Sequence, residues 1–245
     1  MESIIKEFNY QTAPKSDSIV VLGGGPSTGA NKDKINYYIE NNNSIVISIN
    51  YAYPGIKKSD YTYFGNWIQF LKLYNTIVSP NVIVSYFLQK KVKMRLQKDF
   101  YIFWQNAFKK HKFYKIGRGD GKKSMKKKKW TINKKGSLKF LPSPSGFAGI
   151  VISTLFLPKR ILIAGMDGPN NPVKGESLTK PRFSISRQAW RNVAYRSYDH
   201  YKQKRNTLKN LVLPLVFKRN ISIDCFGDSP LWGLDKKKIG INILN

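Results

Sequence analysis

The hydrophobic positions of this chain fall into short runs of β-branched residues that alternate with longer polar or amphipathic stretches. The first run, at 18–22 (Ser-Ile-Val-Val-Leu), is followed directly by three glycines and then by a helix-like stretch at 32–41. A strand, a glycine-rich turn and a helix in this order are typical of the start of an α/β fold. The pattern therefore predicts a buried strand near the beginning of the chain with a tight turn behind it.

The same alternation continues towards the end of the chain. Further strands are predicted at 44–49, 58–64, 77–84, 113–116, 160–164 and 221–225, and helices at 86–108, 145–157 and 186–213. Strands that alternate with helices favour parallel pairing, because each helix carries the chain back to the starting edge of the sheet. We expect a Rossmann-like α/β fold with a largely parallel, doubly wound sheet and helices on both faces.

One segment departs from this pattern in its composition. Residues 109–139 are dense in lysine and contain Asp120 as their only acid. A length of 245 residues with 41% hydrophobic content suits one α/β domain with a sizeable core. We interpret residues 1–245 as a single domain and residues 109–139 as a Lys-rich insertion within it.

The formal net charge is +29. Codon bias in an AT-rich genome would raise lysine, but it does not explain why glutamate is so scarce. The resulting field favours polyanionic partners: nucleic acid ranks first, a peripheral anionic membrane surface or an acidic glycan second, and drift in composition third. The candidate nucleic-acid contacts are Lys122, Lys123, Lys126, Lys127, Lys128, Lys129, Arg187 and Arg191.

Several classes of protein are disfavoured. The first residues carry Glu2 and Glu7 and no apolar run, so we expect neither a signal peptide nor a transmembrane segment. Cys225 is the single cysteine, which excludes an internal disulfide, and with only His111 and His200 a Cys/His zinc site lacks ligands. These features favour a cytoplasmic protein, in the host cytoplasm if the chain is viral.

The candidate phosphate site is the loop after the first strand, made of Gly23, Gly24, Gly25, Pro26 and Ser27. Glycines let the backbone approach an anion, the serine donates a hydroxyl, and the N-terminus of the next helix adds its dipole. The loop is neither a Walker A motif nor a standard dinucleotide fingerprint, which disfavours a P-loop kinase and a simple dehydrogenase. The alternative is an ordinary tight turn between a strand and a helix.

Polar residues follow three of the predicted strands. Asn50, Asn66 and Asp167 each stand where a strand ends, and ligands of open α/β sheets collect at the carboxyl ends of the strands. Amides hydrogen-bond sugars and base edges without placing charge beside a phosphate, so two asparagines suit a nucleotide donor. Taken alone, each of these residues is equally explained as a turn or a capped strand end.

A second helix start carries Ser143, Ser145 and Gly146. Ser145 is explained as a helix N-cap, or alternatively as part of a helix N-terminus that faces the ligand. Asp167 has no partner in an Asp-x-Asp pair, and no other group of carboxylates has the spacing of metal ligands. We therefore expect no metal and no cofactor beyond a nucleotide-linked donor.

His200 is the candidate imidazole base, because His111 stands at the edge of the lysine-rich segment. Arg187 and Arg191 precede it one helical turn apart, as does Arg182 further back. Such a row of arginines suits a diphosphate or an acceptor path, and it suits a solvated helix face equally well.

Together these motifs resemble the bacterial lipooligosaccharide sialyltransferases and their relatives, the motility-accessory flagellin glycosyltransferases and pterin-pyrophosphokinase-like proteins. The resemblance covers most of the chain outside the lysine-rich segment. It rests on Val-Val-Leu-Gly-Gly-Gly-Pro-Ser at 20–27, Ser-Ile-Asn at 48–50, Ser-Asp-Tyr-Thr-Tyr-Phe-Gly-Asn at 59–66, Ser-Pro-Ser-Gly at 143–146, Ile-Ala-Gly-Met-Asp-Gly at 163–168, His200, and Ile-Asp-Cys-Phe-Gly-Asp-Ser-Pro-Leu at 223–231.

The resemblance implies a metal-independent transferase in which Gly25, Asn50, Asn66 and Ser145 bind the donor and His200 is the general base. In the sialyltransferases the residue corresponding to Asp167 is followed by an aromatic pair that helps to hold the donor phosphate. In this chain a glycine and a proline follow it. The candidates for that phosphate role are Tyr195, Tyr198 and Arg182.

These observations lead us to expect a nucleotide-sugar glycosyltransferase with His200 and Asp167 as candidate catalytic residues. The charge favours a polyanionic acceptor, such as DNA with hydroxylated bases, over a glycan or membrane glycolipid. Two further classes stay open. One is a non-catalytic nucleic-acid-binding protein on a degenerate transferase fold, and the second is a pyrophosphokinase-like enzyme, which would need magnesium and its carboxylate ligands.

Overall fold

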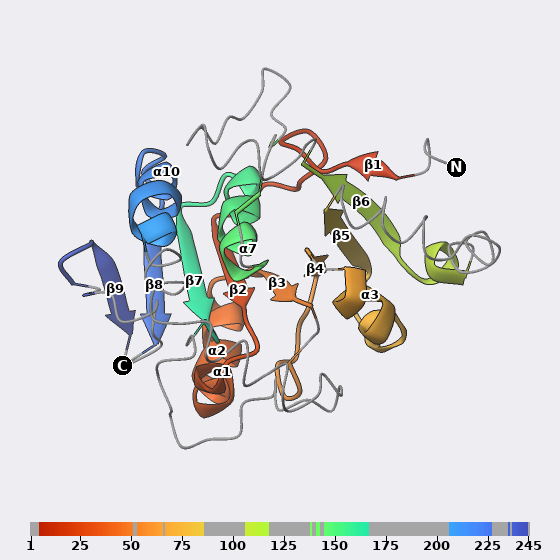
Figure 1. The fold of residues 1–245 in the computed structure, drawn as a ribbon. Coiled ribbons are helices and arrows are strands. Elements are labelled where there is room, and N and C mark those ends of the chain that lie inside the picture. Colours follow the sequence, from red (N-terminus) through yellow and green to blue (C-terminus); the bar gives the residue numbers. More distant parts are fainter. Residues whose placement is uncertain are drawn as a thin grey trace, which may run out of the picture.

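Nine parallel strands form one sheet at the centre of the molecule (Figure 1). The computed structural model describes residues 5–50, 53–65, 67–85, 106–117, 138, 141–142, 145–166, 206–226, 235 and 237–244. From one edge of the sheet to the other, the strands are β1 (Lys6–Glu7), β6 (Lys112–Ile116), β5 (Asn81–Ser85), β4 (Tyr61–Phe64), β3 (Ile45–Ile49), β2 (Ser18–Leu22), β7 (Arg160–Ala164), β8 (Ser222–Phe226) and β9 (Ile241–Leu244).

The order of the strands reverses at β2. This strand pairs with β3 on one side and with β7 on the other. Strands β3 to β6 extend the first side in sequence, whereas β7, β8 and β9 extend the second side. Because all strands are parallel, their carboxyl ends share one edge of the sheet. Ligands of open α/β sheets bind at this edge, beside the point where the strand order reverses.

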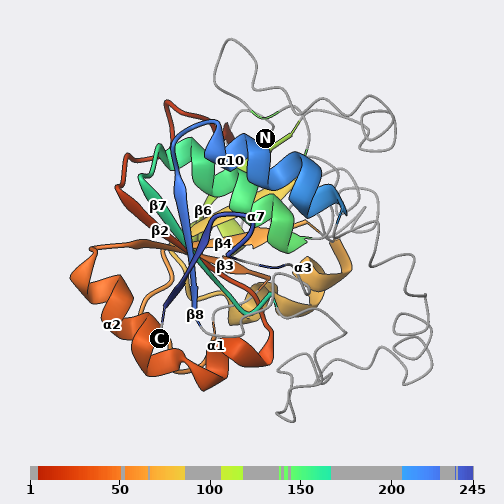
Figure 2. The same ribbon diagram turned by 90° about the vertical axis from the view of Figure 1, so that its left-hand side faces the viewer.

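Helices pack against both faces of the sheet (Figure 2). The two sides of β2 show why: Ile19 and Val21 join one hydrophobic cluster, while Val20 and Leu22 join another on the opposite face. Strands that are buried on both faces read as continuous hydrophobic runs. The first face is covered by α7 (Ser145–Ser153), η3 (Leu208–Val212) and α10 (Leu213–Phe217), and the second by α1 (Pro26–Ala30), α2 (Lys32–Asn41) and α3 (Trp67–Leu73).

Small residues bring α7 close to the sheet. A Cβ built on Gly149 would lie 2.5 Å from the Ile49 Cδ1 and 3.0 Å from the Val21 Cγ1. The helix therefore lies directly on β2 and β3, which is why its first residues reach the carboxyl edge of the sheet. Continuation of the helix as η2 (Thr154–Phe156) completes the predicted segment 145–157.

The predicted α/β class and parallel sheet are confirmed. The first strand and the first long helix have the predicted bounds, but the strand at 58–64 begins only at Tyr61. Before it, the Asp60 carboxylate accepts a hydrogen bond of 2.8 Å from the Val46 N–H, so the side chain of Asp60 caps the start of β3. The strand at 77–84 likewise begins only at Asn81, because Pro80 and the 3₁₀ turn η1 (Tyr74–Thr76) precede it.

Three elements were not predicted. The edge strands β1 and β9 are two and four residues long, too short to produce a clear pattern. Helix α3 follows closely after β4, so its hydrophobic residues read as an extension of the strand signal. Strand β6 lies within the lysine-rich segment 109–139, so this segment begins as part of the sheet.

Two long predicted helices fall mostly outside the described residues. Helical structure is seen at 106–110 within and just beyond the segment predicted at 86–108, and at 206–217 at the end of the segment predicted at 186–213. Among the residues that the structure describes, no helix is long and apolar enough to cross a membrane.

Candidate functional site

The glycine loop is bound tightly to the end of β7. The Gly23 N–H donates a hydrogen bond of 2.8 Å to the Ala164 carbonyl, and the Gly25 N–H donates one of 2.9 Å to the Gly165 carbonyl. In return, the Gly165 N–H donates to the Ser27 Oγ at 2.9 Å. These three bonds join the loop after β2 to the loop after β7, at the point where the strand order reverses.

Two glycines make this close approach geometrically feasible. A Cβ on Gly23 would overlap the Gly165 carbonyl oxygen, and a Cβ on Gly165 would overlap the Gly23 carbonyl oxygen. Gly165 also has a φ of +69°, in the left-handed region that favours glycine. The interpretation of Gly23 as a residue of a tight turn is therefore correct, whatever else the loop does.

The remaining loop residues leave room for a ligand contact. Pro26 is the first residue of α1, and Gly25 before it has an extended backbone with φ −76° and ψ 161°. Within the described part of the chain, the Gly24 N–H makes no hydrogen bond, whereas those of Gly23 and Gly25 are used. Gly24 is half-buried, so its N–H is the loop donor that could reach an anion.

Asn50 ends β3 with an unusual combination of features. Its φ is 71°, a left-handed conformation that asparagine adopts more readily than most residues. Its N–H donates to the Tyr63 carbonyl at 2.9 Å, but its side-chain Oδ1 is buried and has no hydrogen-bond partner among the described residues. Because Leu22 pairs with Ser48, Asn50 lies two positions further along β3, beside Gly24. An unsatisfied buried acceptor at this edge is an expected feature of a binding site.

The first residues of α7 lie at the same edge. A Cβ built on Gly65, directly after β4, would lie 2.9 Å from the Ser145 Oγ and 2.9 Å from the Tyr63 hydroxyl oxygen. Both hydroxyls therefore border the same small space. A Cβ on Gly146 would lie 3.2 Å from the Met166 Sδ, which places this end of α7 over the end of β7.

Tyr63 is a site residue that the sequence did not reveal. Its side chain is 2% exposed, and its hydroxyl makes no hydrogen bond within the described part of the chain. Burial raises the pKa of Tyr63, so the hydroxyl stays protonated and can donate a hydrogen bond. In the sequence this residue is one of several aromatics of a buried strand, and only the neighbouring glycine hints that its hydroxyl has space beside it.

The structure thus brings together the predicted loop residues Gly23 to Ser27, Asn50, Ser145 and Gly146. They share the carboxyl edge of the sheet with Tyr63 and Gly165, and every described side chain that we assign to the site is uncharged. Within the part of the chain that the structure describes, no group of three or more His, Cys, Asp or Glu residues could hold a metal ion. The predicted residues that lie outside the described residues are Asn66, Ser143, Asp167, Arg182, Tyr195, Tyr198, His200, Arg187, Arg191, Lys122, Lys123, Lys126, Lys127, Lys128 and Lys129.

The second histidine of the chain, His111, has a structural contact. The His111 Nδ1 lies 2.9 Å from the Ser79 carbonyl oxygen, and its ring packs edge-on against Phe113. This environment, far along the sheet from the reversal of strand order, agrees with leaving His111 out of the catalytic candidates.

No family model matches this chain, and no curated protein or solved structure is significantly similar to it. The resemblance to the sialyltransferases therefore remains a prediction from the motifs, and the arguments for a site rest on the chain's own geometry.

Proposed function

We propose that this chain is a metal-independent glycosyltransferase with a doubly wound, Rossmann-like domain, which moves a sugar from a nucleotide-sugar donor to a hydroxyl group. The observation that carries the proposal is the buried, unpaired Oδ1 of Asn50 beside the glycine loop, where the strand order reverses. A buried acceptor without a partner reduces stability unless a ligand satisfies it, and a nucleotide or sugar offers the hydroxyl and amino donors that would do so.

The donor fits this edge in two parts. The Gly24 N–H is placed to donate to a phosphate, with the loop held in position by its bonds to β7. Asn50, Tyr63 and Ser145 offer an amide and two hydroxyls without charge, which suits the ribose, the base edge or the transferred sugar. This division agrees with the resemblance, which assigns donor binding to Gly25, Asn50, Asn66 and Ser145.

The proposed reaction is a single displacement at the anomeric carbon. The acceptor oxygen forms the new bond to this carbon, while the bond from the carbon to the donor phosphate oxygen breaks and the phosphate leaves with the electron pair. His200 takes the proton from the acceptor hydroxyl as general base, and Asp167 is the second proposed catalytic residue. Hydrogen bonds from the glycine loop stabilise the charge on the leaving phosphate in place of a metal.

The acceptor is proposed to be a polyanion such as DNA that carries hydroxylated bases. The net charge of +29 supports this choice, because such a protein concentrates near anionic polymers and would be repelled by cationic ones. A glycan or glycolipid acceptor is the alternative outcome of the same experiment.

The test compares two histidine variants of the purified protein in a chelator. Nucleotide-sugars are first screened for a rise in Tm, and transfer from the stabilising donor is then measured on duplex DNA with and without hydroxymethylated bases. His200→Ala should abolish transfer and retain the donor-induced shift in Tm, whereas His111→Ala should retain both. Full activity in His200→Ala would overturn the assignment of the base, and activity only with added Mg²⁺ would overturn the metal-independent mechanism.

A second candidate is a nucleic-acid-binding protein on a degenerate transferase fold. It is favoured by the hydrogen bonds of the glycine loop, because the N–H groups of Gly23 and Gly25 already have partners within the fold. This candidate predicts binding to DNA with no change in Tm for any nucleotide-sugar, and the screen above distinguishes the two.

A further inference from the structure

Charge is distributed unevenly over the described part of the molecule. Three of its acidic side chains form ion pairs with lysines near the middle of the sheet: Asp17 with Lys159 at 2.7 Å, Glu40 with Lys57 at 3.0 Å, and Asp60 with Lys58 at 3.5 Å. A fourth, Asp224, is buried and accepts hydrogen bonds instead. Positive charge in this region is therefore partly neutralised.

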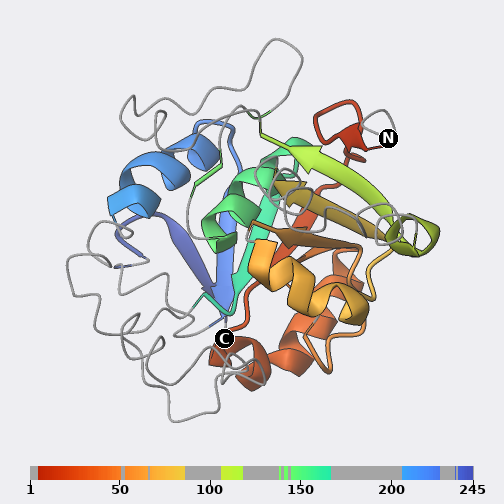
Figure 3. The same ribbon diagram turned by 45° about the vertical axis from the view of Figure 1, so that its right-hand side comes forward.

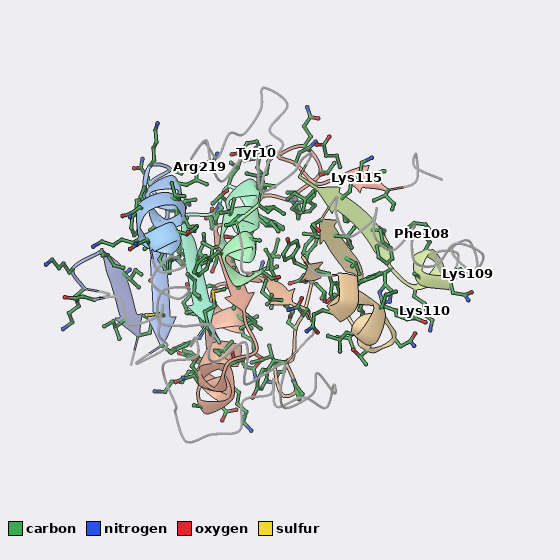
Figure 4. The ribbon with its side chains drawn as sticks, viewed as in Figure 1. Tyr10, Phe108, Lys109, Lys110, Lys115 and Arg219 are labelled. Atoms are coloured by element: carbon green, nitrogen blue, oxygen red, sulfur yellow. The ribbon has the colours of Figure 1, made fainter. Side chains whose placement is uncertain are left out.

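The edge of the sheet at β6 has a different character. Lys109, Lys110, Lys112 and Lys115, the β6 lysine strip, follow one another along the end of the helical residues 106–110 and strand β6. Lys109, Lys110 and Lys112 are exposed and Lys115 is half-buried. Within the described residues none of the four forms an ion pair or a side-chain hydrogen bond. Figures 3 and 4 show this edge, with Lys109 and Lys110 on one end and Lys115 on the other.

The backbone that carries the strip is held firmly. The Lys112 N–H donates to the Pro80 carbonyl at 2.9 Å, and the Lys115 carbonyl accepts from the Phe8 N–H at 2.9 Å. Before the strand, the Phe108 ring packs edge-on against Phe113 with centroids 5.2 Å apart. The four ammonium groups are thus displayed from a fixed support, which lowers the entropy lost when they contact a rigid polymer.

We infer that the β6 lysine strip is a docking surface for the phosphate backbone of duplex DNA. A row of unpaired ammonium groups along an edge matches a row of phosphates, and contact releases the counterions that surround the DNA. The choice of DNA rests on the proposed function, for which this surface would hold the acceptor. DNA binding itself does not depend on transfer and is measured without a donor.

Protection of the sheet edge and attraction to a membrane each account for fewer of these lysines. Lysines on an edge strand also prevent pairing with other chains, but Lys109 and Lys110 precede the strand and are not needed for that. A membrane surface would favour exposed apolar side chains among the lysines, whereas the aromatic ring within this segment, Phe108, packs on Phe113. Nucleic acid is therefore the partner that the surface fits best.

The test compares two quadruple variants with equal loss of charge. The strip variant carries Lys109→Gln, Lys110→Gln, Lys112→Gln and Lys115→Gln. The control variant carries Lys34→Gln, Lys209→Gln, Lys237→Gln and Lys238→Gln, which are exposed lysines on α2, on η3 and before β9. Binding to a fluorescent duplex of about 20 base pairs, long enough to present several phosphates to the strip, is measured by anisotropy over a range of NaCl concentrations. Far-UV circular dichroism with thermal unfolding confirms that each variant folds.

The strip variant should bind the duplex at least about ten-fold more weakly than wild type at about 0.1 M salt, and the slope of log K against log salt should decrease by roughly 3 to 4, since each phosphate contact contributes about 0.9. The control variant should stay within about three-fold of wild type and keep its slope, as expected for charges outside the contact surface.

Equal losses in the two variants would show that net charge alone governs binding, and no loss in the strip variant would place the contact elsewhere; either result overturns the inference. A strip variant that loses binding to phosphatidylserine vesicles but retains binding to DNA would also overturn it in favour of a membrane. The donor-induced shift in Tm, measured in parallel, tests the proposed function separately, because it depends on the carboxyl edge and not on β6.

Discussion

At the scale of single residues, Asn50 connects the backbone of the fold with the proposed chemistry. Its left-handed φ of 71° turns the chain away from the end of β3, and its buried Oδ1 remains without a partner among the described residues. Both features reduce the stability of the free protein. Strain of this kind persists at functional sites, where a ligand or the surrounding structure compensates for it.

Asn50→Gly should separate these two effects. Glycine adopts a positive φ without steric strain, so the free energy of unfolding should change by less than about 1 kcal/mol. Loss of the amide removes one neutral hydrogen bond to the donor, which should weaken its binding by about three- to ten-fold. Asn50→Asp keeps the shape but adds a negative charge near the donor phosphate, so it should weaken binding further. Calorimetric titration with the stabilising nucleotide-sugar measures both effects, and unchanged affinity in Asn50→Gly would remove Asn50 from the site.

The candidate site was only partly predictable at this scale. The glycine loop, Asn50 and Ser145 were predictable because polar or glycine residues that follow a hydrophobic run mark the end of a strand. Tyr63 and Gly165 were not, because their role depends on which strands become neighbours. That Gly23 must fit against Gly165 follows from the pairing of β2 with β7, two segments far apart in the sequence, and no local pattern contains this information.

At the scale of secondary-structure elements, one buried polar contact ties α2 to the far side of the sheet. The Tyr38 hydroxyl donates a hydrogen bond of 2.8 Å to the Asp224 Oδ2 on β8, and Asn242 on β9 donates one of 2.9 Å to the Asp224 Oδ1. Asp224 and Tyr38 are 6% and 8% exposed. Both oxygens of a buried carboxylate thus have donors, which compensates for its removal from water.

Tyr38→Phe should destabilise the protein by about 1.5 to 3 kcal/mol, since the buried Asp224 loses a hydrogen bond to a charged group. Tyr38→Phe combined with Asp224→Asn should recover part of that loss, because the uncompensated charge is then absent. Urea unfolding of the single and double variants measures the coupling. Strictly additive effects would show that the hydrogen bond does not link α2 to β8.

Alkaline pH provides a second measurement on the same elements. Burial raises the pKa of Tyr38, and the negative charge of Asp224 raises it further; burial also raises the pKa of Tyr61 and Tyr63. The unfolded chain releases these protons near pH 10, so it binds fewer protons than the native state above that pH. The stability contributed by the neutral hydroxyls should therefore be complete below about pH 10 and decline as pH rises through the higher folded values. A midpoint of urea unfolding that does not fall between about pH 9 and 11 would contradict the burial of these hydroxyls.

Elements were more predictable than their arrangement. Strands buried on both faces, such as β2, β3 and β7, produce hydrophobic runs that are visible in the sequence, and the helix after the glycine loop has a clear period. The edge strands β1 and β9 gain their structure by pairing with β6 and β8 rather than from their own composition. Pairing at an edge depends on the partner strand, which local propensity does not include.

At the scale of the whole molecule, the net charge of +29 exceeds anything that the fold requires. Positive charges that are confined to a compact volume repel one another more strongly than in the extended unfolded chain, so this charge destabilises the native state. An anionic partner that binds only the folded protein relieves the repulsion and adds its own binding free energy. High charge and polyanion binding are therefore linked through stability.

This linkage predicts how Tm depends on salt and on DNA. Raising NaCl from about 0.05 to 0.5 M shortens the screening length from more than about 10 Å to less than about 8 Å, so wild-type Tm should rise. The strip and control variants each lack the same number of charges, so both should start at a higher Tm in low salt and gain less from added NaCl. Duplex DNA should separate them, because only a protein that binds it in the folded state is stabilised. Addition of the duplex should raise the Tm of the control variant as in wild type and that of the strip variant much less. A DNA-induced shift of equal size in both variants would show that global charge, and not the surface at β6, is responsible for the stabilisation.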